Sequence, residues 1–257
     1  MIDPRAIVAA GARLAADVEV GPYSVIGPHV QVGAGTWIGP HVVINGHTSI
    51  GEGNKLFQFA SIGEAPQDRK YAGEPTRLTI GARNVIREYC TISRGTVQDQ
   101  GVTRIGDDCL LMAYTHVGHD CLLGNNIIMA NLAQIAGHVH IGDWAILSGY
   151  VAVHQFCKIG AHAFLAHHAG ATRDVPPYVM AVGNPAEPHS INVEGLKRRG
   201  FTADQIRNLR NAYRILYRSE LPLAAALEQL SELAETQVEL RPFVEFIALG
   251  SERSLIR

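Results

Sequence analysis

The sequence predicts a mainly-β fold, in which a parallel β-helix of hexapeptide repeats is followed by a small C-terminal α-helical domain. Three observations support this prediction: aliphatic residues recur at every sixth position, glycine often follows them, and helical periodicity appears only near the end of the chain. We expect the β-helix over residues 1–190 and the helical domain over residues 191–257. A chain of 257 residues is long enough to bury a sizeable core.

The six-residue period covers three long runs of the chain. A step of six reaches an aliphatic residue or methionine at each position over 2–62, 80–92 and 105–165. In such a repeat each hexad forms one short strand and three hexads complete a coil, so residues 18 apart stack on one another. We expect the aliphatic residue and the small residue four positions later to face the core. Glycine directly after the aliphatic residue is expected to allow a tight corner.

The cysteines of the chain all occupy the small inward position of a hexad. They are Cys90, Cys109, Cys121 and Cys157. A free cysteine packs there as a small hydrophobic residue. We therefore expect a packing role for them, and neither disulfides nor metal or redox chemistry.

Two segments interrupt the period and are expected to form loops. The segment GEAPQDRKYAGEPTRLT, near 64–79, returns in phase, which predicts a loop that replaces most of one coil. It concentrates polar residues, including Asp68 and Lys70, and long loops in compact repeats often carry function. The segment SRGTVQDQGVTR, near 94–104, shifts the phase by one residue and therefore predicts an insertion.

The last part of the chain is expected to be helical. The β-helix should end in DVPPYVMAVGNPAEP, because prolines cannot continue a hydrogen-bonded ladder. Thr202 and Gln205 form a capping-box signature before an amphipathic run, and LPLAAALEQLSELAE and VELRPFVEFIALG predict two further helices. Residues 197–218 are strongly basic, with Asp204 as their one acid. They form either a solvated helix face or a landing surface for an acidic protein or a phosphate group.

Composition and charge argue against several classes of function. The formal net charge of −2 gives no overall bias toward nucleic acid. No apolar run reaches the roughly 18 residues needed to cross a bilayer, so no stable membrane insertion is expected. The first residues lack the charged start and unbroken apolar stretch of a signal peptide, which favours a cytoplasmic protein.

The hexapeptide HVGHDC, residues 116–121, predicts a polar cluster. Stacking of residues 18 apart places Gly137 and Gln155 over His119. The cluster expected at one edge of three successive coils is His116, His119, His138, His154 and Gln155.

Acid–base catalysis is one role for this cluster, and polar decoration of an exposed edge is the alternative. A neutral His119 suits the removal of a proton from a hydroxyl group. Asp120 can orient it if the corner turns both side chains the same way. Gly137, one coil away, can donate its backbone N–H to an oxyanion formed in acyl transfer.

Five segments carry a family resemblance that covers the whole chain. They are GHTSIGEGNKLFQFASIGEAPQDRKYAGEPTRLTIG, LLMAYTHVGHDC, VAVHQFCKIGAHAF, DVPPYV and NVEGLKRRGF. Together they resemble the acyl-(acyl-carrier-protein)–UDP-N-acetylglucosamine O-acyltransferases, which are left-handed β-helix enzymes. The resemblance implies a homotrimer with active sites between subunits. It also implies transfer of an (R)-3-hydroxyacyl group from acyl carrier protein to the 3-hydroxyl of UDP-N-acetylglucosamine, the first step of lipid A biosynthesis, without a metal or a bound cofactor.

The resemblance further implies roles for individual residues. His119 is the general base, Asp120 lies beside it, and Gly137 is the oxyanion donor. The other residues expected to line the site are Asp68, Lys70, His116, His138, His154 and Gln155, and those expected to hold the nucleotide sugar are Asn192, Glu194, Arg198 and Arg199. The remaining arginines of the tail are the expected surface for the carrier protein.

Two positions depart from the family pattern. Ser93 stands where other members have histidine, which replaces one substrate contact by a shorter polar group. His167 stands where long-chain members have glycine at the end of the acyl groove. A bulky residue there should keep the last methylenes of a long acyl chain from being buried, and each buried methylene is worth about 0.8 kcal/mol. We therefore expect a preference for a donor of roughly 10–12 carbons.

Other hexapeptide-repeat proteins supply the alternative functions. An acetyl-CoA-dependent transferase shares the fold, but the helical tail and the long polar loop argue against it. A zinc-dependent carbonic anhydrase is less favoured still. His162 and His167 have the pair spacing of such enzymes, yet Asn126 stands where their third histidine would be.

Overall fold

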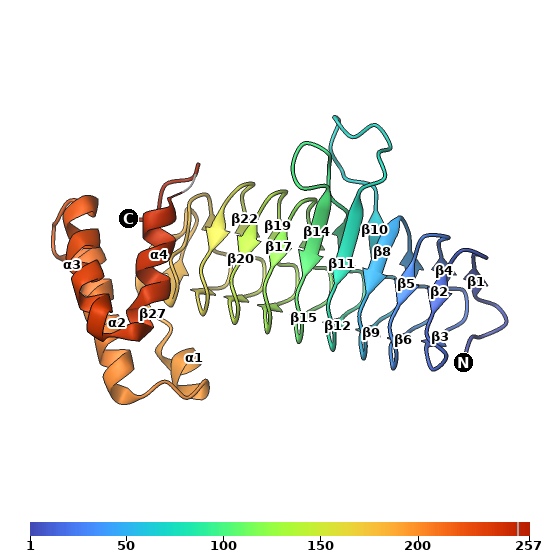
Figure 1. Ribbon diagram of the computed structural model, residues 1–257, viewed down its shortest axis with the longest axis horizontal. Helices are drawn as coiled ribbons and strands as arrows, with labels where there is room; N and C mark the ends of the chain where they lie inside the picture. The colour runs from blue at the N-terminus through green and yellow to red at the C-terminus, as the bar shows by residue number, and fades with distance from the viewer. Residues whose placement is uncertain (251) are drawn as a thin grey trace.

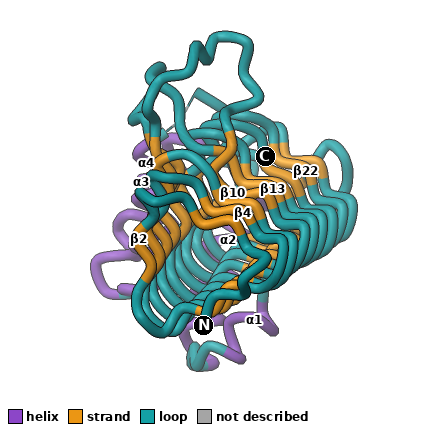
Figure 2. Tube along the Cα trace, turned by 90° about the vertical axis from the view of Figure 1, so that its right-hand side faces the viewer, coloured by secondary structure: helices purple, strands orange, loops and turns teal. Residues whose placement is uncertain are grey.

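The computed structural model describes residues 1–250 and 252–257 and shows a three-sided parallel β-helix followed by helices (Figure 1). The chain visits three sheets in turn, and the end-on view in Figure 2 shows them as the sides of a prism. We call the sheets faces I, II and III and name each corner by the two faces that it joins.

The strands of the three faces are mostly two residues long. Face I contains β1 (Ile7–Val8), β4 (Val25–Ile26), β7 (Val43–Ile44), β10 (Ser61–Glu64), β13 (Thr91–Ser93), β16 (His116–Val117), β19 (Gln134–Ile135), β22 (Ala152–Val153) and β25 (Gly170–Ala171). Face II contains β2 (Arg13–Leu14), β5 (Gln31–Val32), β8 (His47–Ile50), β11 (Arg77–Ile80), β14 (Val102–Ile105), β17 (Leu122–Leu123), β20 (His140–Ile141) and β23 (Lys158–Ile159). Face III contains β3 (Glu19–Val20), β6 (Trp37–Ile38), β9 (Lys55–Leu56), β12 (Val85–Ile86), β15 (Leu110–Leu111), β18 (Ile128–Met129), β21 (Ile146–Leu147), β24 (Phe164–Leu165), β26 (Val179–Val182) and β27 (Glu187–Ile191).

Most strands end on the aliphatic residue of a hexad, and that residue is buried inside the prism. Ile38, Ile44 and Ile62 are fully buried. Ile44 pairs in parallel register with both Ile26 and Ile62, which confirms the predicted 18-residue coil. The four cysteines are also buried and free. Burial raises the pKa of the Cys121 thiol to about 12, so the thiol stays protonated and serves packing.

The corners are turned by a left-handed backbone conformation that does not fall on the repeat glycines, apart from Gly63 (77°) before the first loop. Positive φ angles occur three residues after the aliphatic residue, as at Tyr23 (62°), Asp120 (58°) and His138 (63°). The glycine directly after the aliphatic residue serves close packing instead. A Cβ on Gly21 would lie 2.7 Å from the carbonyl carbon of Gly39 in the next coil. The expected reason for these glycines was therefore wrong, because space between coils is what demands them here.

Both interruptions of the period are loops at the I–II corner. β11 follows β10 directly onto the next face and pairs with β8 through Ile80 and Ile50, so no coil is missing. Residues 65–76 are thus an insertion, and the expectation that they replace most of one coil is wrong. An insertion as long as two hexads preserves the phase just as a replaced coil would. The second loop, residues 94–101, is an insertion as predicted, and both loops stand out from the prism in Figures 1 and 2.

The parallel ladder ends at β26, on which β27 folds back in antiparallel pairing. The helices that follow are α1 (Val193–Arg198), α2 (Ala203–Arg218), α3 (Leu223–Thr236), the 3-10 helix η1 (Val238–Leu240) and α4 (Arg241–Leu249). Thr202 and Gln205 form the predicted capping box of α2. One buried cluster runs from the β-helix into the helices, including Leu196 and Ile206, so the domain boundary near residue 190 stays a prediction. None of the helices in the described ranges is long and apolar enough to cross a membrane.

Candidate active site

The I–II corner gathers the residues predicted to form the catalytic cluster. His119 lies two residues after β16, and the registers of β16, β19 and β22 stack Gly137 and Gln155 over it in the next two coils. The same corner carries His116, Asp120, His138 and His154, and both inserted loops leave from it, with Asp68 and Lys70 on the first. These registers confirm the predicted stacking of residues 18 apart, whereas the roles of the residues stay a prediction.

Asp120 contacts His119 directly. Asp120 adopts its positive φ at the corner, and its Oδ2 atom lies 2.8 Å from Nδ1 of His119. In a flat strand two neighbouring side chains would point to opposite sides, so the corner conformation creates this pair. The Asp120 side chain is buried, whereas 17% of the His119 side chain remains exposed and can reach a substrate.

The second inserted loop holds the carboxylate of Asp120, a contact that the sequence did not reveal. The backbone N–H and the hydroxyl of Thr96 donate to its two oxygens at 2.8 and 2.7 Å, and the Asp120 N–H donates to Oγ1 of Thr103 at 2.8 Å. Burial alone would raise the pKa of Asp120, but the hydrogen bonds from His119 and Thr96 lower it below its ordinary value. The carboxylate therefore stays charged beside the imidazole at neutral pH.

Gly137 forms the surface on which His119 rests. A Cβ at Gly137 would lie 2.6 Å from Cε1 and 2.7 Å from Nε2 of His119, so the ring fits only because this residue has no side chain. The Gly137 carbonyl accepts a hydrogen bond from the N–H of Phe156 at 3.2 Å. Its own N–H has no acceptor within residues 1–250 and 252–257 and is available to a substrate oxygen.

A second histidine–carboxylate pair lies beside the first. Nδ1 of His138 is 2.8 Å from Oδ2 of Asp99, which belongs to the second loop. The His138 ring stacks on Phe156 with centroids 4.4 Å apart and meets His119 edge-on at 5.0 Å. Sequence reasoning missed Asp99, although the phase shift had marked its segment as an insertion. The sequence did not show that this insertion leaves the prism at the same corner as His119.

His116 and His154 complete the row of polar side chains at this corner. Nδ1 of His116 lies 2.7 Å from Oγ1 of Thr91, and burial, together with His119, lowers the pKa of His116, which leaves it neutral at pH 7. His154 is exposed, and its Nδ1 atom lies 3.2 Å from the carbonyl oxygen of Gln155.

The first loop is tied down at its base. Arg94 donates to the carbonyl of Gly63 at 2.8 Å and to the hydroxyl of Tyr71 at 2.6 Å. Within the loop the backbone N–H of Lys70 donates to the carboxylate of Asp68 at 3.0 Å. The Lys70 side chain is exposed. Ser93, just before Arg94, is buried, so a short hydroxyl lies beneath the loop at the position that departs from the family pattern.

A metal ion fits this corner less well than an oriented base does. Among the described residues, His119, Asp120 and His138 form a set whose ligand atoms lie within 4.8 Å of one another. Both carboxylate oxygens already accept hydrogen bonds from Thr96, and Nε2 of His138 is 4.0 Å away from Oδ2. Oδ2 is also contacted by Nδ1 of His119 at 2.8 Å, so a zinc ion bound by these two atoms would have to replace their hydrogen bond.

The residues predicted to hold the nucleotide sugar lie elsewhere on the prism. Asn192 is buried at the II–III corner, where its side chain donates to the carbonyl of His162 at 3.0 Å and accepts the Gly195 N–H at 3.1 Å. Arg199 lies over the ring of Trp144 at 5.2 Å, and its Nη1 is 3.3 Å from Nδ1 of His162.

Three further predicted residues also lie away from the catalytic corner. They are Glu194 and Arg198 of the nucleotide set and His167 of the acyl groove. Glu194 pairs with Lys197 at 2.8 Å, and Arg198 is exposed at the end of α1. His167 is exposed at the III–I corner, with its ring edge-on to Tyr150 at 5.5 Å. A single chain therefore brings the predicted base pair together but not the predicted substrate set.

Comparisons with known proteins agree on one family. The model of the family described as UDP N-acetylglucosamine O-acyltransferase, domain 2, matches residues 174–256. The acyl-(acyl-carrier-protein)–UDP-N-acetylglucosamine O-acyltransferase of Thiobacillus denitrificans is 57% identical over 256 residues, which cover 100% of this chain and 99% of that protein. That of Stutzerimonas stutzeri is 54% identical over 257 residues, with the same coverage.

Solved structures agree with these relatives. The UDP-N-acetylglucosamine acyltransferase of Francisella novicida superposes with a TM-score of 0.98 at 43% identity, over 100% of this chain and 94% of that one. The UDP-N-acetylglucosamine O-acyltransferase of Moraxella catarrhalis gives 0.98 at 46% identity, over 100% and 99% of the two chains. The chain therefore belongs to the family of acyl-(acyl-carrier-protein)–UDP-N-acetylglucosamine O-acyltransferases.

Proposed function

We propose that the protein transfers an (R)-3-hydroxyacyl group from acyl carrier protein to the 3-hydroxyl of UDP-N-acetylglucosamine, the first step of lipid A biosynthesis in the cytoplasm. The observation that carries the proposal is the contact between His119 and the buried carboxylate of Asp120, with Gly137 against the imidazole. Membership of the acyltransferase family supports the choice of substrates.

His119 acts as the general base in this proposal. A proton on Nδ1 is held by Asp120, which leaves Nε2 unprotonated and able to take the proton of the sugar hydroxyl. The oxygen then bonds to the thioester carbonyl carbon, and the Gly137 N–H stabilises the resulting oxyanion. When the carbon–sulfur bond breaks, the imidazolium returns its proton to the leaving thiolate. Asp120 stabilises the imidazolium between these two steps.

The other residues of the I–II corner contact the substrates in this proposal. They are Asp68, Lys70, His116, His138, His154 and Gln155. The diphosphate of the nucleotide sugar is held by Arg198 and Arg199, because guanidinium groups suit phosphate oxygens. Asn192 and Glu194 complete that set, with the buried Asn192 fixing the start of α1.

The active enzyme in this proposal is a homotrimer. His119 lies at the I–II corner, whereas Asn192 and Arg199 lie around His162 at the II–III corner of the same chain. One nucleotide sugar cannot span two corners of one prism, but two corners of neighbouring prisms can face each other across an interface. Three copies around a common axis close such an arrangement.

The preferred acyl donor in this proposal has a medium chain, roughly 10–12 carbons, because each methylene excluded by His167 forfeits about 0.8 kcal/mol. His167 carries its imidazole outward from the III–I corner, where it would end a groove between neighbouring prisms. A glycine at this position would leave the groove open for a longer chain.

Mass spectrometry of the products tests the proposed reaction. Purified protein is incubated with UDP-N-acetylglucosamine and a series of 3-hydroxyacyl carrier proteins, and with acetyl-CoA as the donor of the alternative transferase class. We expect a mono-acylated nucleotide sugar from the carrier proteins only. His119→Ala should reduce turnover by about 10²–10⁴-fold, the usual contribution of a general base. Equal turnover by the variant, or product from acetyl-CoA alone, would refute the proposal.

A further inference from the structure

The second inserted loop, residues 94–101, contacts two histidine–carboxylate pairs in two successive coils. Thr96 donates its backbone N–H and its hydroxyl to the carboxylate of Asp120. Three residues further along the loop, the carboxylate of Asp99 contacts the ring of His138. Asp120 and His138 occupy the same corner position of neighbouring coils, which pair through β16 and β19. The loop therefore reaches across the coil of the predicted base to the next coil.

Hydrogen bonds at the base of this loop give Asp99 a defined position. The N–H of Gly95 donates to the carbonyl of Arg77 at 3.1 Å, and the N–H of Arg77 donates to the carbonyl of Gly101 at 2.9 Å. Both ends of the loop are thus tied to one residue of face II. Inside the loop, the fully buried Thr96 accepts the N–H of Gly101 at its carbonyl, at 3.0 Å.

The ring of His138 lies between two carboxylates. Its Nδ1 atom is 2.8 Å from Oδ2 of Asp99, and its Nε2 atom is 4.0 Å from Oδ2 of Asp120. One face of the ring stacks on Phe156, with centroids 4.4 Å apart and planes 10° apart. The ring meets that of His119 at 89°, with centroids 5.0 Å apart. His138 is therefore held close to the predicted base pair without being bonded to it.

The proton on the His138 ring decides whether this histidine competes with His119. Oδ2 of Asp120 already accepts the Thr96 hydroxyl at 2.7 Å and contacts Nδ1 of His119 at 2.8 Å. A neutral imidazole has one N–H donor, and an ionised carboxylate only accepts hydrogen bonds. Because Asp99 offers an acceptor to Nδ1 of His138, the ring keeps its proton on that side, and Nε2 has none to donate to Asp120.

We propose that Asp99 is a positioning residue that holds the proton of His138 on Nδ1 and so leaves Asp120 to His119. The inference rests on the proposed function, in which His119 is the base and the donor is a 3-hydroxyacyl group linked to the 4′-phosphopantetheine of the carrier protein. Without Asp99 the proton moves to Nε2, and a small rotation of the ring brings this N–H onto Oδ2 of Asp120. The base then loses part of its orientation. Asp99 itself touches no reacting atom.

A double-mutant cycle between Asp99 and His138 tests the proposal. Asp99→Ala should lower kcat roughly tenfold, the worth of one hydrogen bond to a charged group, and Asp99→Glu, which keeps the carboxylate, should recover part of the loss. His138→Phe retains a ring that can stack on Phe156 but has no nitrogen to compete for Asp120. In that background Asp99→Ala should have no further effect on kcat. An equal loss in both backgrounds would overturn the proposal.

Nitrogen-15 NMR of histidine-labelled protein separates this inference from the proposed reaction, because it needs no substrate. Protonated and unprotonated ring nitrogens have different chemical shifts, and the signals that vanish in His138→Phe belong to His138. We expect a protonated Nδ1 in the wild type and a protonated Nε2 in Asp99→Ala. That result supports the inference even if no acyl transfer is found. A protonated Nε2 in the wild type, or no change in Asp99→Ala, contradicts it even if the enzyme is active.

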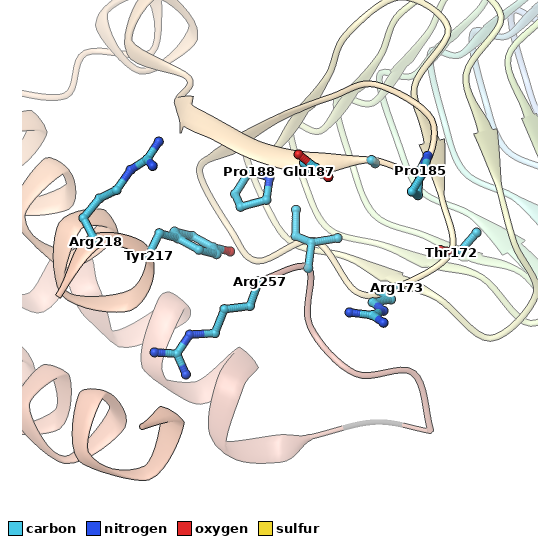
Figure 3. A pocket seen from close by; sticks show the side chains of 10 residues that line it. Thr172, Arg173, Pro185, Glu187, Pro188, Tyr217, Arg218 and Arg257 are labelled. Atoms are coloured by element: carbon cyan, nitrogen blue, oxygen red, sulfur yellow. The ribbon is translucent and has the colours of Figure 1, made fainter. Parts of the chain in front are cut away.

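Two control variants test charge and loop structure separately. Glu187→Gln removes a carboxylate that is exposed at the start of β27, where it lines a cavity of about 560 Å³ at the helical end of the prism (Figure 3). It should leave the ring nitrogens of His138 unchanged. Gln100→Ala alters the exposed surface of the loop next to Asp99 and should keep the wild-type kcat. If Gln100→Ala lowers kcat as much as Asp99→Ala does, the loop acts as a whole and Asp99 has no positioning role of its own.

Discussion

Nδ1 of His119 lies 2.8 Å from Oδ2 of Asp120, although the two residues are neighbours in the chain. The contact depends on the left-handed conformation of Asp120, which turns the carboxylate back toward the preceding side chain. In the proposed mechanism, the residue that contacts and orients the base is thus its own neighbour in the chain. The repeat itself supplies the orientation, because this corner conformation recurs along the whole solenoid.

Asp120→Asn should lower kcat by about a hundredfold or more, because an amide cannot stabilise the imidazolium as a carboxylate does. The KM for UDP-N-acetylglucosamine should change little, since the side chain is buried behind His119. Steady-state kinetics measure both values. Asp108→Asn is the control: Asp108 also lies three residues after the aliphatic residue of its hexad, but it pairs with Arg83. A kcat within threefold of wild type for Asp120→Asn would contradict the role of the pair.

Thr96→Val should move the acidic limb of the kcat–pH profile toward neutral pH. The Thr96 hydroxyl donates to the charged carboxylate of Asp120 and so helps to lower its pKa. Valine has a similar shape without this donor, so the pKa of Asp120 rises and the carboxylate takes up a proton at higher pH. Thr96→Ser should restore the wild-type profile. A simple loss of stability would lower activity without moving the limb, so an unmoved limb argues against this positioning role.

The regular part of the protein could be predicted because each hexad repeats the same physical requirement. Stacking by 18 residues found Gly137 over His119, since no loop interrupts the chain between them. Thr96 and Asp99 could not be found in this way. They belong to an insertion, where position in the hexad no longer fixes position in space. Their partners are set by the folded loop, which the sequence period does not describe.

Phase alone was also insufficient to interpret the first loop and the glycines. An in-phase gap has the same period whether a coil is replaced or a loop is inserted, and only the pairing of β8 with β11 distinguishes the two. A glycine can be required by its φ angle or by a neighbouring backbone, and Gly21 is required by Gly39 of the next coil. Both distinctions depend on contacts between coils.

Gly137→Ala and Gly118→Ala should separate catalysis from folding. The three heavy atoms nearest to a methyl group on Gly137 all belong to the ring of His119, so the variant should fold normally. Its kcat should fall at least tenfold, because the base is pushed out of place. A methyl group on Gly118 would lie 2.7 Å from backbone atoms of Ala136 and Gly137. That variant should lose about 1–3 kcal/mol of stability, as overpacked sites do. Urea unfolding and kinetics on both proteins check the contrast, and a destabilised but fully active Gly137→Ala would reverse it.

The stability of the protein should fall as the pH drops from about 6.5 to about 4. Burial, with Arg199 alongside, lowers the pKa of His162 from its ordinary 6.5 to about 4. In this range the unfolded chain binds a proton at His162 that the folded protein does not, so acidification favours unfolding. Urea midpoints at pH 7 and pH 5 measure the effect. His162→Gln removes the titrating group, and its midpoint should drop less between the two pH values. An equal drop would show that other groups cause it.

His167→Gly should shift the preference of the enzyme toward longer acyl donors. The His167 imidazole lies over Gly149 at the III–I corner: a Cβ placed on Gly149 would be 3.2 Å from Nδ1 of His167. Removal of the imidazole opens this space. Two additional methylenes buried there are worth about 1.6 kcal/mol, or roughly a 15-fold gain in kcat/KM for a donor that is longer by two carbons. The shortest donors should be unaffected, because they do not reach the opened space.

The matched control for this last variant is the adjacent residue. His168 stacks on the ring of Tyr150 at 4.8 Å, whereas His167 meets the same ring edge-on. His168→Gly removes an equal volume one position further along the chain, and the order of donor preference should survive it. A competition assay with mixed donors, read by mass spectrometry, ranks chain lengths within one reaction and so cancels differences in enzyme concentration. If His167→Gly ranks the donors as wild type does, the acyl chain ends elsewhere and His167 does not set its length.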